Sequence, residues 1–305
     1  MKLFYMALLV GCGTDSGPEV LADLHVPPPP ENGVQVITPI FENIAPGTDH
    51  EVCVWTDHIF DHETDIKSTL GFQNEPPGHH VILFYTLQKQ APNTARECTD
   101  TDMATFRYLT GNGNNGSINE APGDLVFRIP AGAQLVVNAH YLNAGDEVLR
   151  GQSLINVNFA DNSPHTPSGS MAIVDTTLEV PPGVSTQHMT CTFEEQFKLW
   201  YLIPHMHRWG QHITLDYTRS GQPTERMIDL DWREQYTFHP PENRYELTEP
   251  FIANPGDKID VGCTWNNTEG RSLTFGFEMC VAFGQYIDTA AKGGVACNTG
   301  DWIPF

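Results

Sequence analysis

Two pairs of segments in this chain match each other, and each pair has one member in either half. GHHVILFYT from Gly78 and GQHITLDYT from Gly210 share Gly, His, Leu, Tyr and Thr at equal offsets. GAQLVVNAHYLN from Gly132 and GDKIDVGCTWNN from Gly256 share an opening Gly, a Val at the sixth place, an aromatic at the tenth and a final Asn. Such internal similarity indicates a duplicated folding unit. The sequence therefore predicts two similar domains side by side.

The matching segments are short runs of β-branched and aromatic residues, and turn clusters separate such runs along most of the chain. The 305 residues include 23 Pro and 26 Gly, and the sequence has no long helical period. This pattern is typical of antiparallel β-sandwiches. The length is sufficient for two separate cores. We predict an all-β fold of two tandem, jelly-roll-like antiparallel β-sandwiches.

Segments rich in Pro, Gly, Ser and Asn set the expected boundaries. HVPPPPENG belongs to a stiff tether that ends near residue 33, so the folded part is expected to begin near Val34. DNSPHTPSG at 161–169 has the composition of an interdomain connection, and GNGNNGS at 111–117 that of a flexible loop. The predicted domains span residues 34–163 and 169–298.

The chain begins with MKLFYMALLVGC, a Lys and an apolar run followed by a small-residue sequence before Cys12. This is the form of a lipoprotein-type signal, with Cys12 as the lipidated first residue, and a shortened ordinary export signal is the alternative. The apolar run is too short to span a membrane, so we expect membrane contact only through a lipid anchor. The expected location is the periplasmic or outer cell surface, as an exported lipoprotein.

The charge and the remaining cysteines narrow the class of protein further. Asp and Glu outnumber Lys and Arg by 38 to 16, which gives a net charge of −22 and argues against a nucleic-acid partner. Without Cys12, six cysteines remain, and none forms a CxxC pair. In an exported chain, this number favours three disulfides over a zinc or redox site, but spacing alone does not fix the pairing. The six are Cys53, Cys98, Cys191, Cys263, Cys280 and Cys297.

Five histidines lie next to β-forming runs in patterns that suit a metal. His205 and His207 in PHMHRW can face one ligand, because residues two apart share a strand face. Alternation in QLVVNAHYLN places His140 on the more polar face of its strand. His79 and His80 follow Pro-Pro-Gly at the start of a strand, where an irregular backbone can turn two successive rings toward one ion.

A sulfur ligand distinguishes between the metals that imidazole suits, which are copper, zinc, iron and nickel. Met279 in TFGFEMCVAF is a candidate, because a thioether favours copper. His58 and His62 could form a second pair, but the surrounding acids favour a solvated loop. His212, opposite His80 in the repeat, is more consistent with a strand residue or a residue that supports the ligands. The roles of Asn138, Tyr141 and Trp209 stay open between orienting ligands and packing.

The ordered set HH, HY, HxH and EMC resembles the copper type II, ascorbate-dependent monooxygenases over about residues 34–298. The resemblance implies two coppers per chain that face each other across a solvent-filled cleft between two β-sandwiches. It assigns an electron-donating copper to His79, His80 and His140, and an oxygen-binding, catalytic copper to His205, His207 and Met279. It also implies three disulfides, Cys53 with Cys98, Cys191 with Cys297, and Cys263 with Cys280.

The implied reaction inserts one atom of dioxygen into a substrate C–H bond and reduces the other to water, with electrons from ascorbate or another one-electron reductant. Peptide-amidating members anchor a substrate carboxylate with an Arg, an Asn and a Tyr, and the corresponding positions here are Ile203, Val281 and Phe283. A carboxylate without such partners is costly in a partly dry cleft. We therefore expect a small neutral or aromatic substrate, unless Arg208 supplies an anchor from another direction.

Two other function classes fit parts of the pattern. A non-catalytic copper-binding or copper-scavenging protein on the cell surface would also use His and Met ligands, but it needs one site and no substrate cleft. A zinc hydrolase is disfavoured, because no Asp or Glu accompanies the histidine pairs as a general base. The enzyme is expected to act as a monomer.

Overall fold

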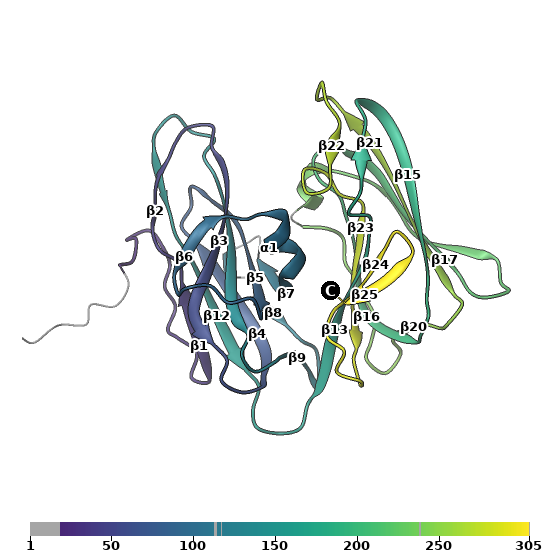
Figure 1. Ribbon diagram of the computed structural model, residues 1–305, viewed down its shortest axis with the longest axis horizontal. Helices are drawn as coiled ribbons and strands as arrows, with labels where there is room; N and C mark the ends of the chain where they lie inside the picture. The colour runs from purple at the N-terminus through teal and green to yellow at the C-terminus, as the bar shows by residue number, and fades with distance from the viewer. Residues whose placement is uncertain (1–18, 113–114, 117, 238, 305) are drawn as a thin grey trace, which may run out of the picture.

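The computed structural model describes residues 19–112, 115–116, 118–237 and 239–304. The chain forms two halves, each built from two facing β-sheets (Figure 1). Strands account for nearly all the regular structure in these ranges, with one short helix, α1 (Asp100–Thr105), and one 3-10 turn, η1 (Glu234–Thr237). The prediction of an all-β, sandwich-type protein is confirmed. Within the described residues, no helix has the length and apolar character needed to cross a membrane.

The first half places a five-stranded sheet against a second sheet, and their inner faces enclose one core. The first sheet has the order β6 (Thr94–Glu97), β3 (Asp49–Ile59), β10 (Gln134–Leu142), β5 (Gly78–Thr86) and β7 (Arg107–Asn112). The facing sheet contains β1 (Gly33–Ile37), β12 (Ser153–Phe159), β4 (Thr64–Gln73), β9 (Leu125–Ile129) and β8 (Ile118–Glu120). A separate pair consists of β2 (Phe41–Ile44) and β11 (Leu149–Gly151). Ile66, Leu83 and Leu135 are fully buried between the sheets.

The second half repeats this architecture. Its four-stranded sheet has the order β15 (Gly183–Thr192), β21 (Lys258–Asn267), β17 (Gly210–Thr218) and β18 (Thr224–Asp231). The facing sheet contains β13 (Thr166–Val174), β23 (Val281–Ile287), β16 (Phe197–His205), β19 (Asn243–Arg244), β20 (Phe251–Ala253), β24 (Val295–Asn298) and β25 (Asp301–Pro304). A short pair consists of β14 (Glu179–Val180) and β22 (Leu273–Thr274). Met206, Leu215 and Trp265 are buried in its core.

The connection between the halves is partly a strand rather than a free linker. β13 starts beside β9, where Thr166 and Pro167 pair with the first half in parallel, and it then pairs with β23 in the second half. Trp200 of β16 is buried against the core of the first half, and its indole Nε1 donates to Ser168 Oγ at 3.0 Å. The sheet of the first half that contains β4 and β9 and the sheet of the second half that contains β13 and β23 therefore form one continuous sheet, which passes from one half to the other (Figure 1).

The matching sequence segments have matching local structure. Gly132 and Gly256 both adopt a positive φ, of 82° and 87°, two residues before β10 and β21 begin. Asn143 donates to two backbone carbonyls and accepts from the N–H two residues later, and Asn267 makes the same three hydrogen bonds in its own half. Gly conformations and side-chain roles thus repeat at the aligned positions.

The Pro-rich segment does not behave as a free tether, and the prediction that order begins near Val34 is wrong. Leu21 and Leu24 are buried in a small cluster with Phe72 and Leu154. The backbone N–H of Leu21 donates to the Gln152 side chain at 2.9 Å. The apolar side chains that precede the prolines have surface to bury, so this part of the chain packs along the first half. Cys12 lies outside the described residues.

The second domain also extends beyond its predicted end at residue 298. β25 pairs with β24, and the Trp302 ring stacks on Phe197 with 5.3 Å between the ring centroids. The apolar face of this last strand therefore completes the core of the second half.

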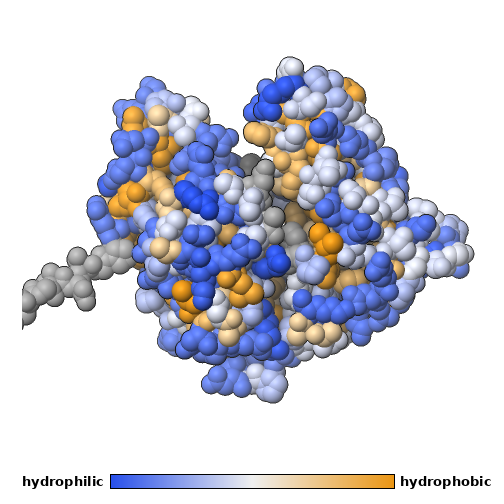
Figure 2. Space-filling model, in the orientation of Figure 1, coloured by the Kyte–Doolittle hydropathy of each residue, from blue (hydrophilic) through white to orange (hydrophobic). Residues whose placement is uncertain are grey.

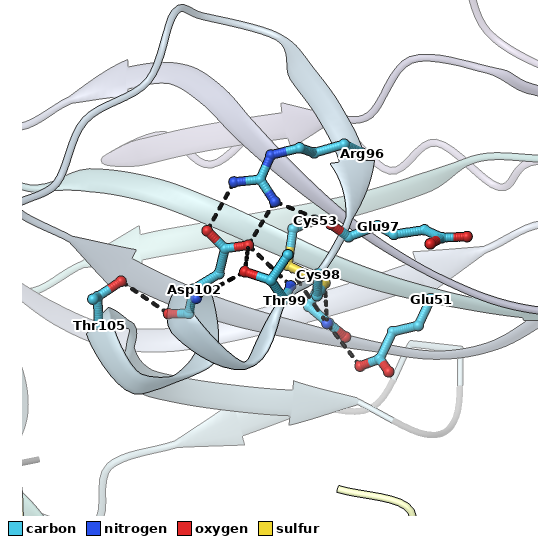
Figure 3. Close-up of a disulfide and its surroundings, with 9 residues drawn as sticks. Glu51, Cys53, Arg96, Glu97, Cys98, Thr99, Asp102 and Thr105 are labelled. Carbon is cyan, nitrogen blue, oxygen red and sulfur yellow. Dashed lines mark hydrogen bonds and ion pairs between the residues drawn. A yellow bond between two sulfur atoms is a disulfide. The ribbon is translucent and has the colours of Figure 1, made fainter.

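The described residues form three disulfides, and they are the three pairs that the resemblance implies. They are Cys53–Cys98, Cys191–Cys297 and Cys263–Cys280. Figure 3 shows the first of these beside the Arg96–Asp102 ion pair and Glu51. Asn138 on β10 donates to Glu51 at 2.8 Å and to Cys98 Sγ at 3.0 Å, so its side chain supports the disulfide.

Candidate metal centre

A β-bulge at His79 brings three histidines of the first domain together. In the β5–β10 ladder, His80 pairs with His140 and Gly78 pairs with Tyr141, so the strand register shifts by one residue at His79. A bulge of this kind places an extra residue in one strand and redirects its side chain. Both successive histidine rings can therefore turn toward the same point, which regular alternation would prevent.

Gly78 is required by the close approach of the chain at this bulge. A Cβ atom on Gly78 would lie 2.5 Å from the Cβ of Gln73 and 2.7 Å from the backbone oxygen of Asn74. The backbone oxygen cannot move without moving the chain that carries it. The glycine of the Pro-Pro-Gly sequence is thus what allows the strand to begin directly before the two histidines.

The three rings direct nitrogen atoms toward one another. The Nδ1 atom of His140 lies 3.1 Å from that of His79 and 3.2 Å from that of His80. Two nitrogens bound to one first-row metal at about 2.0–2.1 Å in tetrahedral geometry are about 3.3 Å apart. Within the described ranges, this is the group of three His, Cys, Asp or Glu side chains whose donor atoms are close enough to hold an ion.

Asp49, at the start of β3, lies on the other side of the His140 ring. Its carboxylate oxygen is 2.5 Å from His140 Nε2. An N–H at Nε2 that donates to this carboxylate leaves the Nδ1 lone pair free and directed at the cluster. Metal-binding histidines commonly have such an outer carboxylate, which fixes the tautomer and the ring orientation.

Burial keeps the cluster neutral, as metal binding requires. Burial lowers the pKa of His79, and the neighbouring His140 lowers it further. For His80, burial lowers the pKa well below its ordinary value, with His140 and His79 as the nearest additional causes. Neutral imidazole nitrogens retain the lone pairs that a metal takes up.

The second group lies where β16 ends and the chain leaves the sheet. His205 is the last residue of β16, Met206 is fully buried on the opposite side, and the His205 and His207 ring centroids are 5.1 Å apart. Burial, with a smaller contribution from His207, lowers the pKa of His205 to about 3. The Nδ1 of His207 is 3.1 Å from the backbone oxygen of Phe277. An N–H at this position donates to that carbonyl and leaves Nε2 as the free donor atom for a metal.

Met279 is joined to the His207 segment by the side chain of Glu278. One Glu278 oxygen, Oε1, accepts from the backbone N–H of His207 at 2.6 Å and from that of Met279 at 2.8 Å. The Met279 side chain is partly buried and packs against a small cluster that includes Val174 and Val281. The Glu278 carboxylate therefore connects the backbone of the predicted sulfur ligand to the segment that carries His207.

An apolar surface adjoins this pair. Phe283 has its ring centroid 5.7 Å from that of His205, and Ile203 pairs directly with Phe283 across β16 and β23. Side chains two apart on a strand share a face, so Ile203 lies on the same face as His205. Arg208 is exposed, with its guanidinium carbon 4.8 Å from the Trp209 ring centroid.

The two groups are close enough across the boundary between the halves to affect each other electrostatically. His207 and His205 both contribute to the lowered pKa of His80, and His239 of the second half contributes to that of His79. Like charges shift one another's pKa only over short distances. Figure 2 shows the surface hollowed between the two halves at the upper edge of that view.

Other histidines and polar residues singled out in the sequence have separate partners. His212 forms ion pairs with Asp229 and Asp231 on β18, at 2.9 Å each. His58 packs edge-on against Phe60, while His62 pairs with Asp61, so these two histidines have different environments.

Tyr141 and Trp209 also have partners outside the histidine groups. The Tyr141 hydroxyl is fully buried 2.7 Å from Ser153 Oγ, and burial raises its pKa to about 12. The Trp209 backbone N–H donates to Glu278 Oε2 at 3.2 Å.

Comparison with known proteins identifies the second domain. Residues 168–298 match the family model of the copper type II ascorbate-dependent monooxygenase, C-terminal domain. Over these residues, the second domain is similar to the copper type II, ascorbate-dependent monooxygenase family. The family is defined by copper, by ascorbate as reductant and by incorporation of one oxygen atom from dioxygen. No curated protein matches this chain.

Both donor sets suit the copper that the family uses. Three converging imidazoles, and a pair of imidazoles with a thioether, are sets that copper accepts. The family match begins at residue 168, so the His79, His80 and His140 group lies outside it, and its fit rests on geometry. Neither Asp49 nor Glu278 was predicted from the sequence as part of the site. Glu278 stands next to Met279 in the EMC motif, which is a local signal, whereas nothing in the sequence links Asp49 to His140.

Proposed function

We propose that the whole chain is a dicopper monooxygenase that hydroxylates a C–H bond of a small, neutral or aromatic substrate with dioxygen and an external reductant. The convergence of three Nδ1 atoms at the His79, His80 and His140 group carries this proposal. It adds a second metal position to the one expected in the family domain, and it lies on the facing half of the molecule. A copper scavenger would need only one of them.

The six side chains have distinct roles in this proposal. His79, His80 and His140 hold one metal through Nδ1, while His205, His207 and Met279 hold the other. Copper at these positions supplies one-electron transfer and dioxygen chemistry. The protein keeps its imidazoles neutral by burial and fixes which nitrogen of His140 and of His207 is free, through Asp49 and the Phe277 carbonyl.

The proposed substrate class follows from the surface next to His205. Ile203 and Phe283 present hydrocarbon and an aromatic face, and neither offers a hydrogen bond to a carboxylate. Burying an unpaired carboxylate there would cost several kcal/mol. Arg208 is exposed and contacts the Trp209 ring, so we do not assign it as a carboxylate anchor in this proposal.

The three disulfides support an oxidising compartment, so we place the protein outside the cytoplasm as an exported, lipid-anchored monomer. Labelling with a radioactive fatty acid in a bacterial expression host would test the anchor, with Cys12→Ala as the unlabelled control.

Metal analysis and electron paramagnetic resonance of the reduced and reoxidised protein test the dicopper assignment. The expected result is two copper equivalents per chain, with one retained and substrate-dependent oxygen consumption abolished in Met279→Ala. Loss of both coppers on this single change would contradict two independent sites. One copper equivalent per wild-type chain, without oxygen consumption, would indicate the alternative function of a copper-scavenging protein.

A substrate panel tests the predicted specificity. Copper-loaded protein is given ascorbate, oxygen and either neutral aromatic compounds or a glycine-extended peptide. Turnover of aromatics with little hydroxylation of the peptide is expected. Efficient hydroxylation of the terminal glycine would show that the apolar wall does not exclude a carboxylate.

A further inference from the structure

Glu278 has an unusual environment for an acidic side chain. It is fully buried, with 0% of its surface exposed, and its carboxylate accepts hydrogen bonds from three backbone N–H groups. Oε1 accepts from His207 at 2.6 Å and from Met279 at 2.8 Å, while Oε2 accepts from Trp209 at 3.2 Å. All three donors belong to the two segments that carry the ligands of the second metal position.

These two segments lack the support of a β-ladder. β16 ends at His205, so the backbone of His207 lies beyond its last cross-strand partner. Met279 lies between β22, which ends at Thr274, and β23, which starts at Val281. Buried N–H groups need acceptors, and where no strand carbonyl is available a side chain has to supply one. The Glu278 carboxylate does so for both segments at once.

The same segment also fixes the His207 ring. The Phe277 carbonyl is bonded to His207 Nδ1, one residue before Glu278. Residues 277–279 therefore set the tautomer of one ligand, hold its backbone and carry the sulfur ligand. Because Oε1 is shared, a shift of the His207 backbone is transmitted to Met279 through a single atom.

We propose that Glu278 is a positioning residue of the second copper site, which holds the Met279 sulfur in register with the His205 and His207 rings. This inference rests on the proposed function, because it takes these three residues as copper ligands. Charge-assisted hydrogen bonds to a carboxylate are short and strong, which suits a fixed distance between ligands. Positioning by atoms that do not touch the metal typically changes metal affinity by about 10- to 100-fold.

Asp257 provides a matched control for a purely structural role. It is also a buried carboxylate of the second domain, with 3% exposure, and it accepts from the backbone N–H of Asn254 at 2.9 Å and of Ser220 at 2.8 Å. Its third donor is the Tyr217 hydroxyl, at 2.6 Å. None of these partners belongs to a ligand-bearing segment.

The test compares Glu278→Gln and Asp257→Asn in the full chain. Gln has nearly the shape of Glu, but its NH₂ group cannot accept, so at least one of the three N–H groups loses its acceptor. Copper K-edge absorption of the Cu(I) protein measures sulfur ligation, and competition with a Cu(I) chelator measures affinity at each site. Amide hydrogen exchange of the metal-free protein reports on His207, Trp209 and Met279 directly.

Glu278→Gln is expected to weaken or remove the copper–sulfur signal, to reduce Cu(I) affinity of the second site at least tenfold and to leave the first site unchanged. The three amides should exchange faster without metal. Asp257→Asn should retain the sulfur signal at a comparable loss of stability.

Wild-type sulfur ligation and affinity in Glu278→Gln would overturn the positioning role, as would an equal loss in Asp257→Asn. Absence of the sulfur signal in the wild type would instead refute the ligand assignment of the proposed function, and the amide exchange would still show whether Glu278 holds the two segments.

Discussion

Removal of the disulfide next to Met279 should weaken copper–sulfur binding, although this disulfide contributes less to the free energy of unfolding than Cys191–Cys297 does. Cys263–Cys280 closes a loop with a sequence separation of 17, and Cys280 directly follows Met279. Loop-closure entropy gives about 3 kcal/mol of stabilisation for a loop of this size. Cys191–Cys297, in the same domain, has a separation of 106, for which the same relation gives about 5 kcal/mol. Cys191–Cys297 therefore contributes more to stability, whereas Cys263–Cys280 is the closer of the two to Met279 along the chain.

The experiment replaces each pair by Ala and measures two quantities. Guanidinium denaturation gives the free energy of unfolding, and absorption spectroscopy of the Cu(I) protein gives the copper–sulfur signal. Removal of Cys263–Cys280 should cost about 3 kcal/mol and lose most of the signal, since Met279 then keeps only its packing and the Glu278 bond. Removal of Cys191–Cys297 should cost about 5 kcal/mol and keep the signal.

Two results would refute this reasoning. One is a wild-type copper–sulfur signal without Cys263–Cys280, and the other is a loss of signal that follows stability in both variants. If the protein without Cys191–Cys297 does not fold, Cys53–Cys98 serves as the comparison, since its separation of 45 corresponds to about 4 kcal/mol.

Three further changes test the first cluster and the buried ligands. Gly78→Ala forces the bulge apart, so it should reduce stability by about 1–3 kcal/mol and prevent copper binding at the first site. Gly270→Ala, with open space around it, should change neither stability nor copper content. Equal copper content in the two variants would refute the steric argument. Asp49→Asn should reduce the copper affinity of the first site about tenfold and leave the affinity of the second site unchanged, as measured by chelator competition. An unchanged affinity of the first site would show that His140 needs no carboxylate. His205 has a folded-state pKa of about 3 against about 6.5 in the unfolded chain, so below pH 6.5 only the unfolded state takes up its proton. The stability of the metal-free protein should therefore fall by about 1.4 kcal/mol per pH unit from this residue between pH 6 and 4, and His205→Gln should flatten the slope in pH-dependent denaturation.

The parts of the site that were predictable from sequence are those in which a side-chain pattern reports directly on backbone geometry. Adjacent histidines after Pro-Pro-Gly predicted an irregular strand start, and the bulge at His79 is that irregularity. Apolar alternation predicted the strand that carries His140. In both cases the signal and the structure lie within a few residues of each other.

The parts that were not predictable depend on contacts that leave no pattern. Asp49 reaches His140 from a strand 91 positions away, and an isolated carboxylate before a β run is common. Glu278 binds backbone N–H groups, which every residue other than proline possesses, so its partners carry no residue-type signal. The prolines dominate the composition around Leu21 and Leu24 and predict a tether there, whereas the burial of these two leucines orders the segment.

The duplicated strands explain why the two proposed metal positions differ although the domains match. Gly210 pairs with Trp265 and His212 with Thr264, so the second domain has the same bulge as the first, with Gln211 in the place of His79. The bulge is therefore a feature of the repeated scaffold that does not require a metal.

At the aligned positions, the first domain carries three histidines, while the second carries Gln211, His212 and Thr264, of which only the histidine is a common metal ligand. His212 is instead ion-paired with Asp229 and Asp231. The ligands that we propose for the second domain come from the end of β16 and the segment before β23, outside the repeated strand pair. Since no bulge aligns these ligands, their geometry depends on other connections, which are the Glu278 carboxylate, the Phe277 carbonyl and the Cys263–Cys280 disulfide.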